Sequence, residues 1–186
     1  MIEIRAATAA DAGAIASIYA PYVVTSAVSF EDEAPSPETI AERMRLKEGL
    51  YPWLVAVSTD EGTILGFTYA SRFRERPAYR FAVETSVYVA GELQRNGVGR
   101  MLYDALMDTL EAQGFTQALA AIALPNDASI KLHEALGFFR AGVYREIGYK
   151  HGQWRDVGLW QRPLAEPVVP PMEPKSFQQT GVVRQS

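Results

Sequence analysis

The chain has 186 residues, of which 48% are hydrophobic and 22% are charged, a composition that suits one globular domain with a substantial core. Its formal net charge of -4 argues against a nucleic-acid-binding surface, and the lack of cysteine excludes disulfide and thiolate chemistry. With two histidines, no multi-histidine metal site is expected. The start MIEIRAAT has no secretory apolar segment, and no apolar run approaches membrane-spanning length. We therefore expect a cytoplasmic protein that binds neither nucleic acid nor membrane.

The hydrophobic pattern predicts a succession of strand, two helices, three strands, helix, strand, helix and two strands, with no internal repeat. The strands are expected at residues 2–7, 53–58, 63–73, 81–89, 118–124, 139–150 and 155–162. Thr8 and Asp11 resemble a capping box that opens the first helix, and Ser36 before Pro37 opens the second. The fourth helix is expected at residues 126–136.

The third helix follows two glycines in the stretch LQRNGVGRMLYDAL and is expected to end at Gly114. Its inward face is expected to hold Val98, Met101, Leu102, Ala105, Leu106 and Leu110. Unpaired N–H groups at a helix start bind anions, and glycines let a ligand approach the backbone. The segment lacks the third glycine of a dinucleotide loop and the G-K-S/T of a P-loop. A tight strand-to-helix connection without a ligand is the alternative.

These elements describe an α/β (α+β) sandwich, in which a mixed, mainly antiparallel sheet of about seven strands carries helices on both faces. The domain is expected to span residues 1–164. The next segment, EPVVPPMEP, holds four prolines and is followed by residues without periodicity. Residues 165–186 are therefore predicted to be a poorly ordered tail, with docking on a partner subunit as the alternative.

Two motifs resemble landmarks of the GNAT superfamily of N-acetyltransferases. The sequence QRNGVG resembles its acyl-CoA pyrophosphate loop, and Asn126, Ser129, His133 and residues 136–138 resemble the helix that flanks the pantetheine. The stretches VETSVYV, LPNDASIKLHEALGF and KHGQWRDVGLWQ are similar to the phosphinothricin and methionine sulfoximine N-acetyltransferases within it. This resemblance runs from about residue 5 to residue 164, and it implies the GNAT fold and acetyl-CoA as co-substrate.

The resemblance also implies roles for the matching residues. Glu84 stands where the family carries its proposed base for the substrate ammonium. His133 stands where most of the superfamily has a tyrosine, and it is expected to protonate or contact the leaving thiolate, with a packed structural histidine as the alternative. The residues expected to bind the cofactor are Val87, Tyr88, Val89, Arg95, Asn96, Gly97, Val98, Gly99, Arg100 and Asn126.

Four arginines lie in RFRERPAYR, directly before the strand of Glu84. Arg74 and Arg76 match basic positions of the family, whereas Arg72 and Arg80 do not. Guanidinium groups bind carboxylates and phosphinates in bidentate geometry, which favours a small amino-acid-like acceptor. The residues expected to bind this acceptor are Phe30, Arg74, Arg76, Glu84, Thr85 and Ser86.

The sequence therefore predicts an acetyl-CoA-dependent N-acetyltransferase acting on the α-amine of a small amino acid or an analogue such as phosphinothricin or methionine sulfoximine. A protein N-terminal acetyltransferase and a non-catalytic acyl-CoA-binding sensor are the alternatives. Four aromatic residues lie near the C-terminus: Tyr144, Tyr149, Trp154 and Trp160. A small domain does not readily bury this much aromatic surface. Together with the family resemblance they predict a homodimer, unless the rings fill the core.

Overall fold

The computed structural model describes residues 1–46, 49–91 and 96–184, and its centre is a seven-stranded sheet in the order β1-β2-β3-β4-β5-β7-β6. The strands are β1 (Ile2–Ala6), β2 (Trp53–Ser58), β3 (Ile64–Arg72), β4 (Ala82–Val89), β5 (Gln117–Ala123), β6 (Phe139–Lys150) and β7 (Gln153–Pro163). All neighbours are antiparallel except β4 and β5, which are parallel. The predicted mixed, mainly antiparallel sheet is confirmed.

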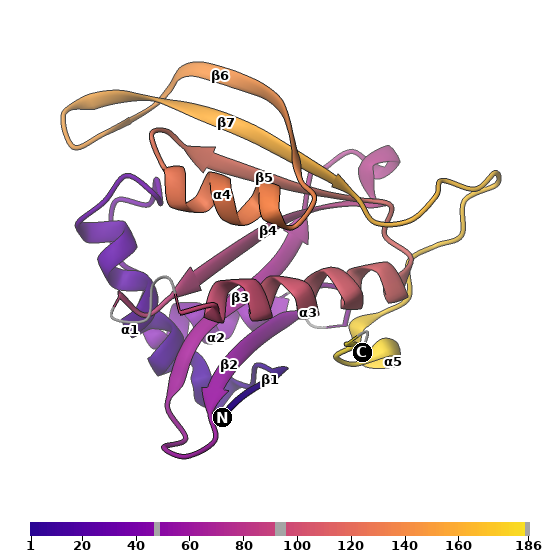
Figure 1. Ribbon diagram of the computed structural model, residues 1–186, viewed down its shortest axis with the longest axis horizontal. Helices are drawn as coiled ribbons and strands as arrows, with labels where there is room; N and C mark the ends of the chain where they lie inside the picture. The colour runs from indigo at the N-terminus through magenta and orange to yellow at the C-terminus, as the bar shows by residue number, and fades with distance from the viewer. Residues whose placement is uncertain (47–48, 92–95, 185–186) are drawn as a thin grey trace.

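Helices cover both faces of this sheet, as Figure 1 shows. They are α1 (Ala12–Val24), α2 (Pro37–Leu46), α3 (Val98–Gln113), α4 (Asp127–Ala135) and α5 (Phe177–Thr180), with the 3₁₀ turns η1 (Ala9–Asp11) and η2 (Pro77–Tyr79). One core lies under α1 and α2, and a larger one lies under α3. Side chains of β2 contribute to both cores, because successive residues of a strand point to opposite faces. Trp53 and Val55 face α1 and α2, whereas Leu54 and Ala56 face α3.

The ends of the helices follow the predicted signals. The Asp11 carboxylate accepts hydrogen bonds from the Thr8 backbone N–H at 2.7 Å and from both terminal nitrogens of Arg5 at 2.7 and 2.8 Å. Gly114 ends α3 in the left-handed conformation, with φ of 92°. The inward face predicted for α3 is confirmed except at Met101, which is 38% exposed. Met101 lies beside the exposed Asp104 at the edge of the buried face of α3, whereas Val98 in the same turn is buried.

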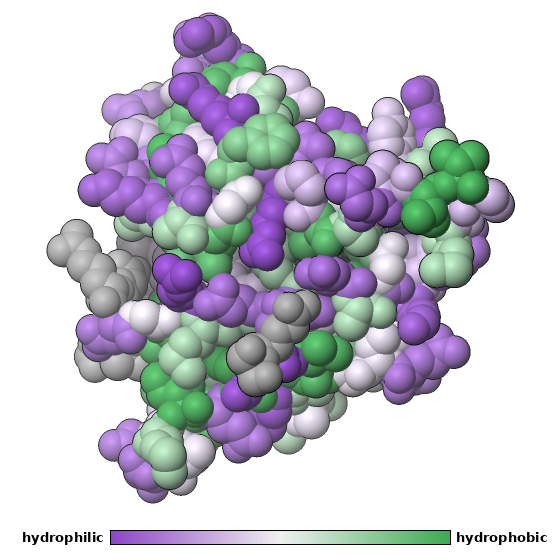
Figure 2. All heavy atoms as spheres, turned by 45° about the vertical axis from the view of Figure 1, so that its right-hand side comes forward, coloured by the Kyte–Doolittle hydropathy of each residue, from purple (hydrophilic) through white to green (hydrophobic). Residues whose placement is uncertain are grey.

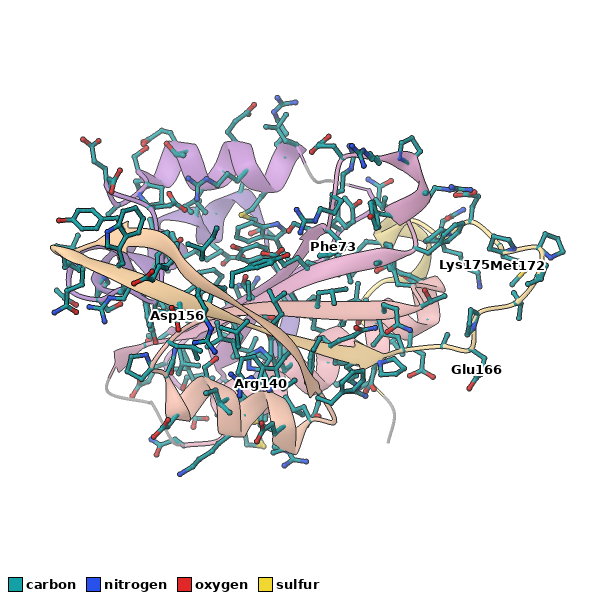
Figure 3. All side chains as sticks on the ribbon, turned by 90° about the horizontal axis from the view of Figure 1, so that it is seen from above. Phe73, Arg140, Asp156, Glu166, Met172 and Lys175 are labelled. Carbon is teal, nitrogen blue, oxygen red and sulfur yellow. The ribbon has the colours of Figure 1, made fainter. Side chains whose placement is uncertain are left out.

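The segment after β7 leads outward and then returns to contact α3, while the poor order expected of residues 165–186 stays a prediction. Figure 3 shows Glu166 and Met172 on the loop that leads outward and Lys175 where it comes back. Lys175 and Gln113 exchange hydrogen bonds, from the Lys175 N–H to the Gln113 carbonyl at 2.7 Å and from Gln113 Nε2 to the Lys175 carbonyl at 2.9 Å. Phe177 packs against the larger core. The proline-rich sequence does not reveal these contacts of Lys175 and Phe177. The domain boundary at residue 164 stays a prediction.

The surface agrees with the ordinary composition of the chain. On the face shown in Figure 2, hydrophobic side chains form small areas separated by hydrophilic ones. No helix in the described part of the chain is long and apolar enough to span a bilayer.

Candidate active site

The central feature of the site is the divergence of β4 and β5. The two strands pair from Ala82 to Glu84 and from Gln117 to Leu119. Beyond this point residues 85–88 and residues 120–123 line a cleft between the strands. Helix α4 and its N-cap close the cleft with Asn126, Ser129 and, from the last turn of the helix, His133. Parallel strands that separate in this way leave room for an extended ligand beside backbone amide groups.

Alternation along β4 sends neighbouring side chains to opposite faces of the sheet. Tyr88 packs in the core under α1 and α2, whereas Val87 and Val89 pack against the core under α3. Glu84 therefore shares the α1 and α2 face with Ser86 and Tyr88. It pairs across the sheet with Ser71, near the end of β3. The structure thus puts Glu84 at the point where the strands begin to separate, beside the loop that carries the arginines.

His133 is 3% exposed, and its hydrogen bonds define its protonation. Its Nδ1 lies 2.7 Å from the Ser129 carbonyl oxygen, which only accepts, so Nδ1 carries the proton. Nε2 is then an acceptor, and the Tyr103 hydroxyl donates a hydrogen bond to it at 3.0 Å. Burial lowers the pKa of His133, which keeps the ring neutral. The predicted catalytic histidine is therefore hydrogen-bonded through both ring nitrogens.

Tyr103 is a site residue that the sequence did not reveal. It comes from α3, is fully buried among the core residues, and lines the cleft beside His133. Its hydroxyl is also 3.4 Å from Thr85 Oγ1, and the Thr85 hydroxyl donates to the Leu119 carbonyl at 3.2 Å. Burial raises the pKa of Tyr103, so it stays a protonated phenol. The inward face predicted for this helix did not include Tyr103.

The glycine-rich loop ends at the N-terminus of α3. Gly97 is the N-cap residue with φ of 80°, a conformation that glycine adopts readily and L side chains rarely do. A Cβ on Gly99 would lie 3.4 Å from side-chain carbons of Leu132 and Val89, so the helix start packs closely against α4 and β4. Asn96 and Gly97 are exposed, which leaves this helix end accessible to an anion. Arg95, predicted to belong to the loop, lies outside the described residues.

Two further predicted cofactor residues have protein partners. Arg100 forms an ion pair with Asp104 at 3.5 Å on the exposed face of α3. Asn126 caps α4, because its Oδ1 accepts from the Ser129 N–H at 3.1 Å. Their roles toward the cofactor stay predictions.

Two of the four arginines in the loop before β4 form ion pairs with glutamates. Arg72 pairs with Glu75 at 3.0 Å, and Arg80 pairs with Glu173 at 2.6 Å. Arg74 instead reaches β6, where its guanidinium lies 3.3 Å from the Tyr144 hydroxyl. Arg76 is exposed at the N-cap of η2.

Phe30 lies in the connection between α1 and α2 and packs on β6. A Cβ at Gly148 would overlap its ring, so this close contact requires glycine. The buried Lys150 side chain holds the same connection, because its Nζ donates to the carbonyls of Val23, Ser29 and Glu31, each at 2.6 Å. The Nε2 atom of His151 lies 3.2 Å from the Ser26 carbonyl oxygen in the same connection. Among the described residues, no group of three or more acidic or histidine side chains could hold a metal ion.

Comparison with known proteins gives a consistent set of relatives. Residues 4–159 match the family model described as acetyltransferase (GNAT) domain. The chain is 45% identical over 174 residues to a phosphinothricin N-acetyltransferase of Streptomyces viridochromogenes, covering 93% of this chain and 94% of that protein. It is 33% identical over 170 residues to an L-methionine sulfoximine/L-methionine sulfone acetyltransferase of Salmonella typhimurium, with coverage of 91% and 98%.

The solved structures agree with these relatives. The crystal structure of a GNAT superfamily phosphinothricin acetyltransferase from Sinorhizobium meliloti, in complex with acetyl-CoA, superposes with a TM-score of 0.86 at 38% identity and covers 92% of this chain and 94% of that chain. An acetyltransferase structure from Salmonella typhimurium with acetyl-CoA gives a TM-score of 0.84 at 32% identity, with coverage of 91% and 98%.

Proposed function

The chain belongs to the GNAT acetyltransferase family and is an N-acetyltransferase that uses acetyl-CoA, and we propose that its acceptor is the α-amine of a small amino acid or analogue. Phosphinothricin and methionine sulfoximine are the model acceptors, because relatives that cover more than nine-tenths of the chain carry those names. The observation that carries the proposal is the position of Glu84, at the mouth of the β4–β5 cleft and next to the loop of Arg74 and Arg76.

The cleft and the start of α3 fit acetyl-CoA, which supplies the acetyl thioester. The left-handed Gly97 and the exposed helix end suit a pyrophosphate, with Asn96, Val98, Gly99 and Arg100 around it and Arg95 expected beside them. The backbone of Val87, Tyr88 and Val89 runs along the diverging edge of β4 and would pair with the pantetheine. One of these N–H groups would donate to the thioester carbonyl oxygen and stabilise the negative charge that develops there.

Proton transfer is divided between the two faces of β4. Glu84 accepts the proton of the substrate ammonium, directly or through one water, while Arg74 and Arg76 bind the acceptor's carboxylate. Ser86 and Phe30 flank the acceptor on the Glu84 face. On the other face, Thr85 and His133 hold the Tyr103 hydroxyl at the cleft wall. His133 has no proton on the nitrogen that faces Tyr103, so for the Tyr103 hydroxyl to protonate the departing thiolate, its single proton would have to leave the hydrogen bond to His133 Nε2 and turn toward the cleft.

Glu84→Gln tests this proposal, because it keeps the shape of the side chain and removes its basicity. We expect kcat to fall by about 10²–10⁴-fold at neutral pH in a thiol-release assay, while the KM for acetyl-CoA changes little. The loss should shrink as pH rises, because more of the amine is then already deprotonated. Glu61→Gln, in the exposed turn between β2 and β3, is the matched control. A near-normal kcat for Glu84→Gln at neutral pH would leave Glu84 only an orienting role.

The same assay separates the alternative functions. A peptide that begins with alanine, offered beside free amino acids, measures protein N-terminal acetylation. This alternative is tested because the chain is also similar to the structure of a ribosomal-protein-alanine N-acetyltransferase from Brucella melitensis, with a TM-score of 0.81 at 31% identity. Binding of acetyl-CoA without thiol release on any acceptor would indicate a sensor.

We also propose a homodimer formed through the β6–β7 hairpin. Tyr144, Tyr149 and Trp154 are 44%, 62% and 63% exposed on this hairpin, and exposed aromatic clusters mark interaction surfaces. Trp160 was predicted to join them but is 2% exposed, because it packs in the larger core. Sedimentation at micromolar concentration is expected to show a dimer, and Trp154→Ala is expected to weaken it. A cytoplasmic location stays a prediction.

A further inference from the structure

The segment after β7 contacts the loop that carries Arg74 and Arg76. It leaves the sheet and passes the C-terminal end of α3 on its way to α5 (Figure 1). The contact joins Glu173 of this segment to Arg80 at the end of the loop. Glu173 lies beyond residues 4–159, which match the GNAT domain, and Arg80 does not match a basic position of the family. The family motifs therefore give no role to either residue.

Hydrogen bonds to a buried glutamine fix the segment just after Glu173. The Lys175 N–H donates to the Gln113 carbonyl at 2.7 Å, and Gln113 Nε2 donates to the Lys175 carbonyl at 2.9 Å. Gln113 is 1% exposed, and its Nε2 also donates to the Leu50 carbonyl at 2.7 Å. Because Glu173 precedes Lys175 by two residues, its backbone starts from a fixed point beside the end of α3.

The Glu173 carboxylate meets the Arg80 guanidinium side-on. Arg80 Nε lies 2.8 and 2.9 Å from the two carboxylate oxygens, and Nη2 donates to Oε1 at 2.6 Å. The guanidinium also lies over the Phe81 ring, 4.3 Å from its centroid, and Nη1 donates to the Pro77 carbonyl at 3.1 Å. The two side chains are 46% and 65% exposed, but bidentate geometry within a network is the condition under which an exposed ion pair contributes to stability.

Arg80 connects Glu173 to Arg74 through the 3₁₀ turn η2. The Pro77 carbonyl at the start of η2 accepts from both the backbone N–H and Nη1 of Arg80, each at 3.1 Å. Tyr79, the last residue of η2, packs perpendicular to Phe73, with ring centroids 5.6 Å apart and an interplanar angle of 83°. The Arg74 guanidinium lies over the Phe73 ring, 5.1 Å from its centroid. A displacement of η2 therefore moves the ring on which Arg74 rests.

We infer that Glu173 is a positioning residue for the acceptor: it holds Arg80 and thereby fixes η2, the Phe73 ring and the guanidinium of Arg74. The C-terminal segment thus completes the acceptor site from outside the residues that match the GNAT domain. Glu173 acts through Arg80, so its loss weakens acceptor binding and leaves the chemical step and the acetyl-CoA contacts unchanged. The inference rests on the proposed function, because that function gives Arg74 the acceptor's carboxylate.

Glu173→Gln removes the charge and keeps the size of the side chain. In the thiol-release assay with methionine sulfone, its KM for the acceptor should rise about two- to fivefold, the effect of losing a well-formed exposed ion pair, while kcat and the KM for acetyl-CoA stay unchanged. The carboxamide of methionine sulfone lacks the carboxylate, so its kcat/KM should not change. Glu166→Gln, at an exposed position of the same segment, is the matched control.

Two further measurements test the route through Arg80. In an Arg80→Gln background, Glu173→Gln should add nothing, because the pair is already broken. Amide hydrogen exchange at Tyr79 and Arg80 needs no substrate, and it should quicken about two- to fivefold in Glu173→Gln and stay as in the wild type in Glu166→Gln. Thermal denaturation checks that each variant folds.

The outcomes separate this inference from the proposed function. A wild-type protein that acetylates no free amino acid contradicts the proposed function and, with it, the role of Glu173 in acceptor binding. If the wild type acetylates methionine sulfone, an unchanged acceptor KM in Glu173→Gln, or an equal loss for the carboxamide, overturns the inference and leaves the proposed function standing. Unchanged amide exchange in η2 overturns it as well, whatever the activity.

Discussion

The buried contact between Tyr103 and His133 allows one substitution to be worked out in detail. Tyr103→Phe keeps the ring in its buried position and removes only the hydroxyl that donates to His133 Nε2 at 3.0 Å. The Nε2 atom then stays buried without that donor, which costs about 1–3 kcal/mol of folding free energy. For a chain of this size, the corresponding fall in Tm is about 2–12 °C.

The same substitution should change the protonation of His133. The Tyr103 hydroxyl stabilises the neutral ring, so its removal should raise the pKa of His133 from its lowered value. Since the folded protein holds His133 neutral, the unfolded chain takes up a proton first as pH falls below about 6.5, and stability decreases. A higher folded pKa makes this decrease smaller in Tyr103→Phe. Because the Tyr103 hydroxyl is also the proposed donor to the thiolate, kcat should fall by about 10²-fold or more.

Three measurements check these expectations: thermal denaturation, the NMR titration of the His133 ring, and kcat. The thermal denaturation covers about pH 5 to 8, a range that brackets the ordinary histidine pKa. The chain has two histidines, so His151→Gln assigns the resonances. Tyr51→Phe, outside the network, is the control for losing a phenol. An unchanged His133 pKa in a folded Tyr103→Phe protein would refute the deduced tautomer.

Three further predictions concern the capping box at η1, the glycine-rich loop and the Lys150 contact. The Arg5 hydrogen bonds lower the pKa of Asp11 from 3.8 to about 2. The ionised Asp11 therefore contributes about 2 kcal/mol to the free energy of unfolding above pH 4, and this contribution is lost as pH falls toward 2. Asp11→Asn should remove this acid-dependent step in denaturation curves. Gly97→Val should raise the KM for acetyl-CoA strongly in a folded protein, whereas Gly62→Val, at a left-handed glycine in a remote turn, should lower Tm without that effect. Lys150→Met removes three hydrogen bonds to the chain around Phe30, so the KM for the acceptor should rise more than the KM for acetyl-CoA, and equal changes in both would contradict a positioning role.

The elements that the sequence predicted well are those whose signal is local. Strand alternation in residues 81–89, the Thr8 and Asp11 pair and Gly114 each act within a few residues, and the structure confirms them. Met101 and Trp160 were misjudged, because burial depends on tertiary neighbours: Trp160 packs in the larger core, and Met101 lies outside it at the edge of the buried face of α3. The returning tail depends on a buried glutamine in α3, Gln113, which a local pattern cannot identify as its partner.

The candidate site divides in the same way. Family motifs indicated Glu84, His133 and the loop of Gly97, but they did not indicate Tyr103, whose role depends on a contact between α3 and α4.

The alternation of β4 explains how one strand can serve both reactants. A carboxylate that accepts the ammonium proton and a phenol that donates its proton to the thiolate would interfere if they shared a hydrogen bond. Glu84 and Thr85 are neighbours in the chain, yet a strand directs their side chains to opposite faces. Glu84 can therefore meet the ammonium on the α1 and α2 face while Thr85 contacts Tyr103 on the α3 face. Burial is the main cause of the raised pKa of Tyr103, and the charge of Glu84 adds only a smaller increase from the other face of the sheet.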